Sequence, residues 1–265
     1  MSKQVQSRFA VPIGGIVKLL WVLCILTAVC GDAWAAEIGY TKEGRISLFG
    51  EIRAGDTAKA IALLRANPLS FIKSPWALNS NGGDIVEAIR LGELIKDLYQ
   101  SVEVLDYQSK CASACFFVYI SAVNRMAFAN TLGIHRPYFD QRQYSNLDPD
   151  TARKKYDELA SKVRAFMKQN DVPNDLVEKM FSLASDEIYW VSSEDDDKLG
   201  QRPYWFDQYM VSKCGFNSRK YFDAVTRLRR GSESERPQIL RWTNCEVDTT
   251  MDRGLENAKK YLKYK

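Results

Sequence analysis

Histidine is nearly absent from this chain, because the 265 residues include only one, His135. A metal site built from several histidines is therefore excluded, and any imidazole chemistry must use His135 or a residue of another subunit. Cysteine is also sparse: six residues without a CxxC pair argue against a zinc site and against a disulfide-dense scaffold. The formal net charge is only +4 and no dense basic stripe is present, so we expect no nucleic-acid partner.

Long apolar runs are scarce as well. Hydrophobic residues make up 46% of the chain and charged residues 26%, which is typical of a globular protein and excludes a disordered chain or a polytopic membrane protein. The exception is Leu19–Cys30, an apolar run behind a basic leader that is shorter than the roughly 20 residues of a membrane span. Small residues at Ala33 and Ala35 follow it, as signal peptidase requires. We therefore predict a signal peptide over residues 1–35 and export to the periplasm; an uncleaved membrane anchor and lipidation at Cys30 are the alternatives.

Four cysteines remain after this leader: Cys111, Cys115, Cys214 and Cys245. An even number of cysteines in an oxidising compartment permits pairing. Cys214 and Cys245 both lie in the C-terminal region and are expected to staple it. Cys111 and Cys115 are four residues apart and would be neighbours on a helix, but spacing alone does not supply the geometry that a bridge needs.

Strand-like and helix-like segments alternate through the first half of the mature chain. The strand-like segments are 45–52, 74–79, 102–107, 125–128 and 132–135, and the helix-like ones are 57–65, 85–95 and 112–122. Asp84 and Glu87 form a capping box before the second of these helices. This order predicts the parallel crossovers of an α/β fold. Residues 148–184 are expected to be mostly helical with a break near Pro173, 189–191 to be a strand, and the tail from about 202 to be helical in parts.

Three short segments have residues suited to acyl transfer, although each also has a structural explanation. Gly82-Gly83, between a strand and a capped helix, makes a tight turn or directs a backbone amide at an oxyanion. Ser113, at the start of an apolar helix, is either a small packed residue or a nucleophile at a helix N-terminus. His135, at a strand end, is either a structural hydrogen-bonded residue or a general base. Together they supply a donor, a nucleophile and a base, which would converge at the carboxyl ends of parallel strands.

These segments resemble the proteolytic subunit of the Clp protease, within the wider Clp/crotonase superfamily. The matching stretches are RISLFGEI at 45–52, LNSNGGDIVEAIRLGELI at 78–95, CASACFFVYISA at 111–122, NRMAFANTLGIHRP at 124–137 and WVSSEDDDKLG at 190–200. With the export leader and the CASAC segment, the chain looks most like an exported branch of Clp-like proteins. The resemblance implies an α/β fold, a Clp/crotonase-like spiral of ββα units with a helical extension and a cysteine-containing C-terminal tail.

The resemblance also implies roles for individual residues. Ser113 is expected to be the nucleophile, His135 the general base and later acid, and the amides of Gly83 and Ala114 the oxyanion hole. The position that corresponds to the orienting aspartate holds Ile188. Asp186, two residues earlier and on the same face of an extended segment, is the candidate for this third role.

The implied function is an exported serine peptidase that needs no cofactor or metal and acts on peptides or unfolded proteins. The resemblance further implies a homo-oligomer, and export makes an ATPase partner unexpected. The expected domains are the signal peptide at 1–35, a Clp/crotonase-like domain at 36–201 and a C-terminal extension at 202–265.

Four other functions remain as alternatives. One is a Ser–Lys mechanism, for which Lys110 lies three residues before Ser113. The second is a cysteine nucleophile, Cys111 or Cys115, with His135 as its base. The third is crotonase-like acyl-CoA chemistry, which does not explain a serine and a histidine at peptidase positions. The fourth is a catalytically degenerate scaffold that binds peptides or a protein partner.

Overall fold

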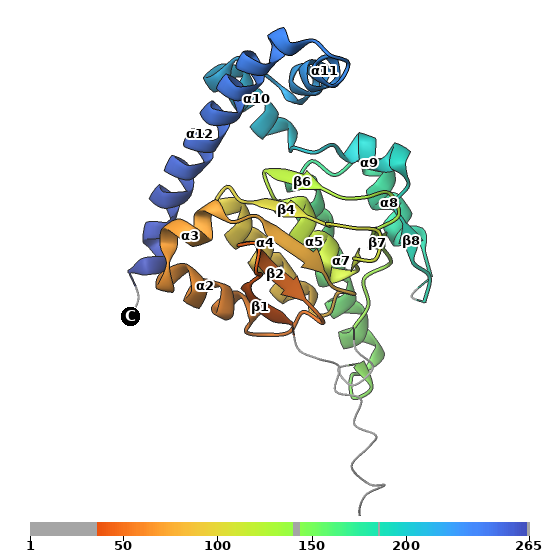
Figure 1. The fold of residues 1–265 in the computed structure, drawn as a ribbon. Coiled ribbons are helices and arrows are strands. Elements are labelled where there is room, and N and C mark those ends of the chain that lie inside the picture. Colours follow the sequence, from red (N-terminus) through yellow and green to blue (C-terminus); the bar gives the residue numbers. More distant parts are fainter. Residues whose placement is uncertain (1–35, 140–143, 185, 264–265) are drawn as a thin grey trace, which may run out of the picture. The chain divides into compact units, whose positions relative to one another are not determined.

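The larger of two sheets has five strands, of which only the outermost pair is antiparallel (Figure 1). A computed structural model describes residues 36–139, 144–184 and 186–263. The strand order in this sheet is β1 (Glu37–Tyr40), β2 (Ile46–Phe49), β3 (Trp76–Asn79), β4 (Ser101–Glu103) and β6 (Asn124–Met126). The pairs β2–β3, β3–β4 and β4–β6 are parallel, so each needs a crossover connection. The parallel α/β arrangement expected from the sequence is confirmed.

Helices supply these crossovers. They are α2 (Asp56–Ala66), α3 (Pro68–Lys73), α4 (Ile85–Asp97) and α5 (Ala114–Ser121). Half of the expected capping box is present at α4, where the Asp84 side chain accepts a hydrogen bond from the amide of Glu87 at 3.0 Å. The return bond is not formed, because the amide of Asp84 donates to the carbonyl oxygen of Ile52 and the Glu87 carboxylate accepts from the amide of Thr57. Helix α3 was not expected, because Asn-Pro was interpreted as the end of α2. Instead, the side chain of Asn67 caps a new helix and Pro68 occupies its first turn, where its missing N–H costs nothing.

A second sheet of three short strands lies at the carboxyl end of β3. Its order is β5 (Cys111–Ala112), β7 (Leu132–Ile134) and β8 (Tyr189–Trp190), with β5–β7 parallel and β7–β8 antiparallel. A parallel bridge between Ser80 and Cys111 connects the chain after β3 to β5. The expected strand 102–107 is wrong beyond Glu103, because Asp106 accepts hydrogen bonds from the amides of Gln108 and Ser109 and turns the chain toward this second sheet.

Helix α5 lies in the core, since every one of its residues is buried. It packs against α4 at Gly92, where a Cβ would lie 2.3 Å from Ser121 Oγ and 3.1 Å from the carbonyl oxygen of Phe117. This close approach fixes the C-terminal half of α5 against α4.

The remainder of the chain is helical, as expected. It contains α7 (Pro149–Gln169), α8 (Asn174–Ser182), α9 (Ser193–Leu199), α10 (Tyr204–Cys214), α11 (Ser218–Arg229) and α12 (Arg236–Leu262). The break near Pro173 is confirmed between α7 and α8. None of the helices in the described part of the chain has both the length and the apolar character to cross a membrane. The expected leader, residues 1–35, lies outside the described residues.

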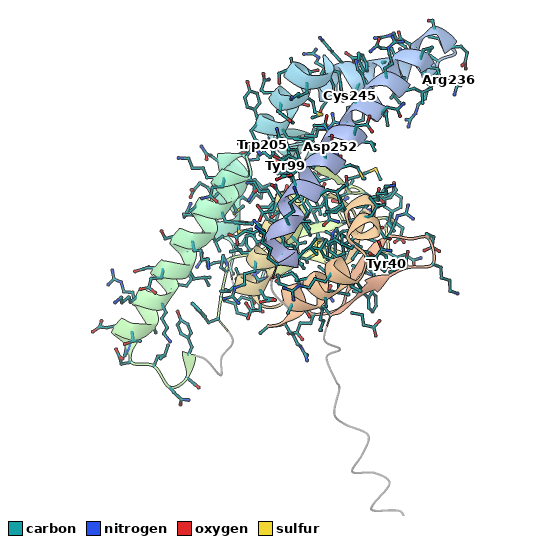
Figure 2. The ribbon with its side chains drawn as sticks, turned by 90° about the vertical axis from the view of Figure 1, so that its left-hand side faces the viewer. Tyr40, Tyr99, Trp205, Arg236, Cys245 and Asp252 are labelled. Carbon is teal, nitrogen blue, oxygen red and sulfur yellow. A yellow bond between two sulfur atoms is a disulfide. The ribbon has the colours of Figure 1, made fainter. Side chains whose placement is uncertain are left out.

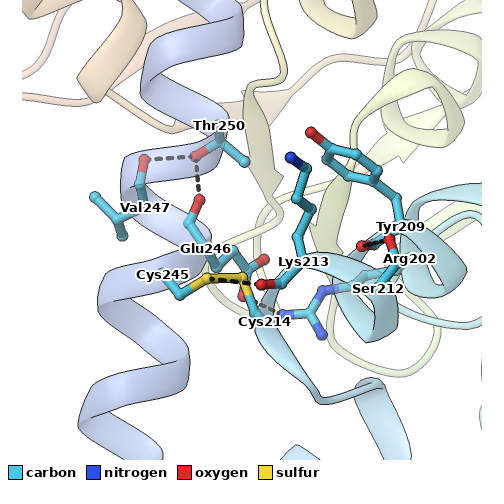
Figure 3. The surroundings of a disulfide bond; sticks show 9 residues. All are labelled: Arg202, Tyr209, Ser212, Lys213, Cys214, Cys245, Glu246, Val247 and Thr250. Atoms are coloured by element: carbon cyan, nitrogen blue, oxygen red, sulfur yellow. Dashed lines mark hydrogen bonds and ion pairs between the residues drawn. A yellow bond between two sulfur atoms is a disulfide. The ribbon is translucent and has the colours of Figure 1, made fainter.

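A disulfide joins two of the C-terminal helices and lies beside a buried ion pair (Figure 3). The Cys214–Cys245 bond, expected from the sequence, joins the end of α10 to α12. Nearby, Arg202 donates to Asn124 Oδ1 at 2.7 Å and to Glu246 Oε2 at 2.6 Å, and Asn124 donates to Glu246 Oε1 at 2.8 Å. Because Asn124 begins β6, this network connects α12 directly to the larger sheet.

Helix α12 also packs along α3 and α4. At Gly254 a Cβ would lie 2.6 Å from the carbonyl oxygen of Leu98 and 2.8 Å from Ile72 Cγ2, so only glycine permits this approach. Asp252 and Cys245 mark the course of the helix in Figure 2. One turn beyond Gly254, Asn257 donates to the carbonyl oxygen of Asp97 at 2.7 Å. The mixed α/β fold with a helical region and a cysteine-containing tail is thereby confirmed.

A buried carboxylate links α4 to the start of α2 and makes stability depend on pH. Glu87, 3% exposed, accepts a hydrogen bond from the amide of Thr57 at 2.7 Å and pairs with Arg90. Burial acts to raise the pKa of Glu87, but these hydrogen bonds outweigh it and hold the pKa below its ordinary value. Its stabilising contribution is therefore complete above the unfolded-state pKa of about 4.3 and is lost as pH falls through the lower native value.

We expect Glu87→Gln to lower the free energy of unfolding at pH 7 by about 1–3 kcal/mol, because it removes a charged hydrogen-bond acceptor. The difference from the wild type should shrink in acid. Urea unfolding at pH 7 and at successively lower pH measures both effects. An equal difference at every pH would contradict the linkage to this carboxylate.

Candidate active site

Ser113 lies at the sharp turn between β5 and α5, in a backbone conformation that serine rarely adopts. Its φ is +56° and its ψ is −124°, outside the right-handed and extended regions. A serine at the N-cap of a helix normally accepts a hydrogen bond from an amide of the first turn. Ser113 makes no such bond, and its hydroxyl has no hydrogen-bond partner among the described residues. Its hydroxyl is therefore free for another interaction.

His135 directly follows β7, the strand next to β5. The two strands are parallel with Ala112 opposite Gly133, and the amide of Ser113 donates to the carbonyl oxygen of Gly133 at 2.9 Å. The structure thus brings Ser113 and His135 to the same edge of the small sheet. No hydrogen bond between the two side chains is present in the described part of the chain, as is common for catalytic pairs without substrate.

One hydrogen bond determines which nitrogen of His135 carries the proton. Nδ1 lies 2.9 Å from the carbonyl oxygen of Arg136, which can only accept, so Nδ1 is the donor in this bond and the lone pair of the neutral ring is on Nε2. The ring is 9% exposed and contacts the ring of Tyr138 at 5.3 Å between centroids. This arrangement holds the imidazole in the tautomer that a general base requires. The sequence analysis missed this acceptor, because a backbone carbonyl has no sequence signal.

The glycine pair lies directly against the serine turn. At Gly82, with φ +103°, a Cβ would lie 2.5 Å from Ser113 Cβ and 2.8 Å from the amide nitrogen of Ala114. At Gly83 a Cβ would lie 2.2 Å from the carbonyl oxygen of Ile52. Glycine is therefore required at both positions by close backbone approach as well as by positive φ.

Two backbone amides at this turn have no partner. The N–H groups of Gly83 and Ala114 donate to no group of the described residues. The Ala114 amide belongs to the first residue of α5, where helix geometry leaves N–H groups unpaired and the helix dipole favours negative charge. Gly82 packs against Ser113, and the Gly83 amide belongs to the next residue of the chain. Both amides are thus unpaired among the described residues.

The third position of the expected triad holds an apolar residue. Strand β8 pairs with β7 so that Tyr189 is opposite Ile134, and Ile188 is the residue directly before β8. Ile188 is 45% exposed, and its Cγ2 would lie 3.1 Å from a Cβ at Gly133.

The structure does not bring Asp186 to His135. The amide of Glu187 donates to the carbonyl oxygen of Ala184 at 3.2 Å, so the chain turns before β8 rather than continuing as the extended segment on which the choice of Asp186 depended. Asp186 is exposed and makes no hydrogen bond or ion pair with any residue that the structure describes.

The groups needed for two alternative nucleophilic mechanisms are engaged elsewhere. Lys110 Nζ donates to the carbonyl oxygen of Asn130 at 3.1 Å and lies 5.0 Å from the ring centroid of Trp190. Cys111 and Cys115 form a disulfide, so neither sulfur is a thiolate. The geometry favours the hydroxyl of Ser113 over both alternatives.

Comparison with known proteins gives similarity of structure alone. No protein-family model matches the chain. A search of curated protein sequences also finds no match. Among solved structures, ClpP1 from Listeria monocytogenes, determined as a single-residue variant, is 18% identical over 60% of this chain and 90% of its own, with a TM-score of 0.44. The membrane-bound stomatin-specific protease 1510-N, also a variant, is 13% identical over 64% of this chain and 83% of its own, with a TM-score of 0.41. The structural neighbours of the chain thus include two proteases, both at low sequence identity.

Proposed function

We propose that the protein is a serine hydrolase of the peptidase type that cleaves peptide bonds through an acyl-enzyme on Ser113. The observation that carries this proposal is the strained turn at Ser113, whose hydroxyl is free while two unpaired amides adjoin it. A non-glycine residue in such a conformation costs about 1–3 kcal/mol and persists where the surrounding structure enforces it, often at functional sites. A serine that only capped α5 would adopt the relaxed conformation instead.

The reaction follows from the positions of these groups. His135 Nε2 removes the proton from Ser113 Oγ as the oxygen attacks the substrate carbonyl, and the amides of Gly83 and Ala114 donate to the resulting oxyanion. The imidazolium then protonates the leaving amine, which departs as the acyl-enzyme forms. A water molecule, deprotonated by the same imidazole, hydrolyses the ester and returns the hydroxyl to Ser113.

We assign the orienting role to the Arg136 carbonyl rather than to Asp186. The carbonyl holds the correct tautomer of His135 but carries no full charge, so it stabilises the imidazolium less than a carboxylate would. We therefore expect a slower enzyme than one with a complete Ser-His-Asp triad.

The compartment and the assembly are part of the same proposal. Two disulfides in the fold support export, because such bonds persist in oxidising compartments, and residues 1–35 are proposed as the leader. The resemblance to Clp-like proteins supports a homo-oligomer that acts on short or unfolded substrates without an ATPase. A second candidate function, a peptide-binding scaffold without catalysis, is favoured by one observation: the position expected for the orienting aspartate holds the apolar Ile188.

A fluorophosphonate probe separates these two functions without knowledge of the substrate. It phosphonylates only a serine that has a working base and oxyanion hole, so we expect one adduct by intact mass on the wild type and none on Ser113→Ala. Ser109→Ala, which removes a hydroxyl from the loop before β5, is the matched control and should be labelled like the wild type. If folded wild-type protein forms no adduct, the hydrolase proposal is contradicted and the peptide-binding scaffold remains.

A further inference from the structure

A disulfide spans the proposed nucleophile. Cys111 in β5 and Cys115 in the first turn of α5 are bonded, with their Cα atoms 5.1 Å apart, and Ser113 is the middle residue of the segment they enclose. Both cysteines have 0% exposed surface. The bond is therefore part of the packed core, away from solvent reductants.

Hydrogen bonds hold the chain firmly up to the amide of Ser113. The amides of Cys111, Ala112 and Ser113 donate to the carbonyl oxygens of Thr131, Ser80 and Gly133 at 2.9, 3.0 and 2.9 Å. These three bonds anchor β5 on both of its sides. After the amide of Ser113, the chain reverses into α5 without a side-chain cap. The disulfide crosses this reversal and ties the first turn of α5 back to β5.

The relaxed alternative for Ser113 is an ordinary N-cap. In that conformation the backbone is extended and the hydroxyl accepts a hydrogen bond from the amide of Cys115 or Phe116. That bond would occupy the hydroxyl and reorient the amide of Ala114. In the observed conformation the Ser113 hydroxyl accepts no such bond and the Ala114 amide is unpaired. The surrounding structure must therefore oppose the relaxed N-cap conformation.

We propose that the Cys111–Cys115 disulfide is a positioning device that keeps Ser113 in its strained conformation and its hydroxyl free. The inference rests on the proposed hydrolase function and adds a regulation to it: the chain with reduced cysteines folds with an inactive, N-capped serine, and oxidation of the two thiols creates the active site. Bond formation removes two electrons and two protons, which a disulfide oxidant such as oxidised glutathione accepts. Activity is thereby confined to chains that have folded under oxidising conditions.

The second disulfide allows a controlled test. In residues 36–265 with Cys214→Ala/Cys245→Ala, Cys111 and Cys115 are the remaining cysteines, so refolding with dithiothreitol or with oxidised glutathione changes this bond alone. We expect the reduced form to react with a fluorophosphonate roughly 10–100-fold more slowly than the oxidised form, as small misplacement of a reacting group does. The thermal unfolding midpoints of the reduced and oxidised forms should differ far less than they would if the reduced form had lost its fold. The hydrogen bond of the relaxed N-cap offsets part of the stability that is lost with the cross-link. Alkylation and mass measurement verify the state of the thiols.

Further comparisons keep the test decisive. Cys111→Ala/Cys115→Ala, with the second disulfide intact, should be slow in both redox conditions and covers the case in which the reduced chain does not refold. Equal rates for oxidised, reduced and double-alanine proteins would overturn the positioning role while leaving the hydrolase proposal intact. If the oxidised parent takes no adduct, the hydrolase proposal fails. The ¹³C shifts of Ser113, which report its backbone conformation, then decide the positioning role: a shift toward the extended N-cap on reduction supports it and unchanged shifts overturn it.

Discussion

His135→Ala is expected to lower the rate of fluorophosphonate labelling, and of peptide hydrolysis once a substrate is known, by roughly 10³-fold or more. The reason is that the other two candidate groups among the described residues are engaged elsewhere: Lys110 is bonded to the Asn130 carbonyl, and Asp186 lies in a separate turn. Labelling reactions quenched at successive times and analysed by intact mass measure this rate.

Tyr138→Phe is the control for this prediction. It keeps an aromatic ring beside His135 and removes only the hydroxyl, so it should be labelled at the wild-type rate. Thermal unfolding of both variants shows whether either change has disturbed the fold. Full reactivity of a folded His135→Ala protein would rule out His135 as the base.

Gly82→Ala is expected to reduce labelling about 100-fold. The added Cβ would lie 2.5 Å from Ser113 Cβ, whereas carbon atoms in contact are about 3.5–4.0 Å apart, so one of the two must move by about 1 Å. Displacement of a reacting group by that distance costs on the order of 10²-fold in rate. The Ala114 amide, 2.8 Å from the same position, would be displaced with the serine. Labelling kinetics and thermal unfolding of the variant test the prediction.

Gly55→Ala separates the steric contact from the backbone strain. Gly55 has φ +100°, close to the +103° of Gly82, but a Cβ there would meet no atom within 4 Å. In both variants an alanine at positive φ lowers the free energy of unfolding, while only Gly82→Ala brings a Cβ into contact with Ser113. We expect Gly55→Ala to lose stability and keep its reactivity. Equal reactivity of the two variants would show that Gly82 does not position Ser113.

The sequence pattern predicted the elements of the core better than their connections. The periodicity around Ile85 and the capping box at Asp84 are local signals, and α4 begins where they indicate. The division into two sheets depends instead on which strands meet, through pairs such as Ser80 with Cys111 that are 31 residues apart. Helix α3 was missed because Asn-Pro is compatible with both the end of one helix and the start of the next.

In the proposed site, too, local signals could be predicted from the sequence and contacts made by the fold could not. Ser113, His135 and the glycine pair are side-chain or conformational signals and could be identified from the sequence. The bond between His135 and the Arg136 carbonyl could not, because every residue has a carbonyl and only the fold selects one. Asp186 was chosen by counting along an extended segment, and the hydrogen bond between Ala184 and Glu187 interrupts that segment. Local turns of this kind are the features that spacing arguments do not capture.

The packing of α12 has a consequence for biosynthesis. Ile72 and Leu98, which lie against Gly254, belong to helices made early, and Arg65 donates to the carbonyl oxygen of Tyr261 across 196 positions of the chain. A nascent chain that has emerged only as far as Gly200 can form both sheets but leaves this apolar surface uncovered. Contacts of such long range form late and slowly. Most of α12 must therefore have emerged before the protein can bury this surface of α3, and until then that surface is available to chaperones and to aggregation.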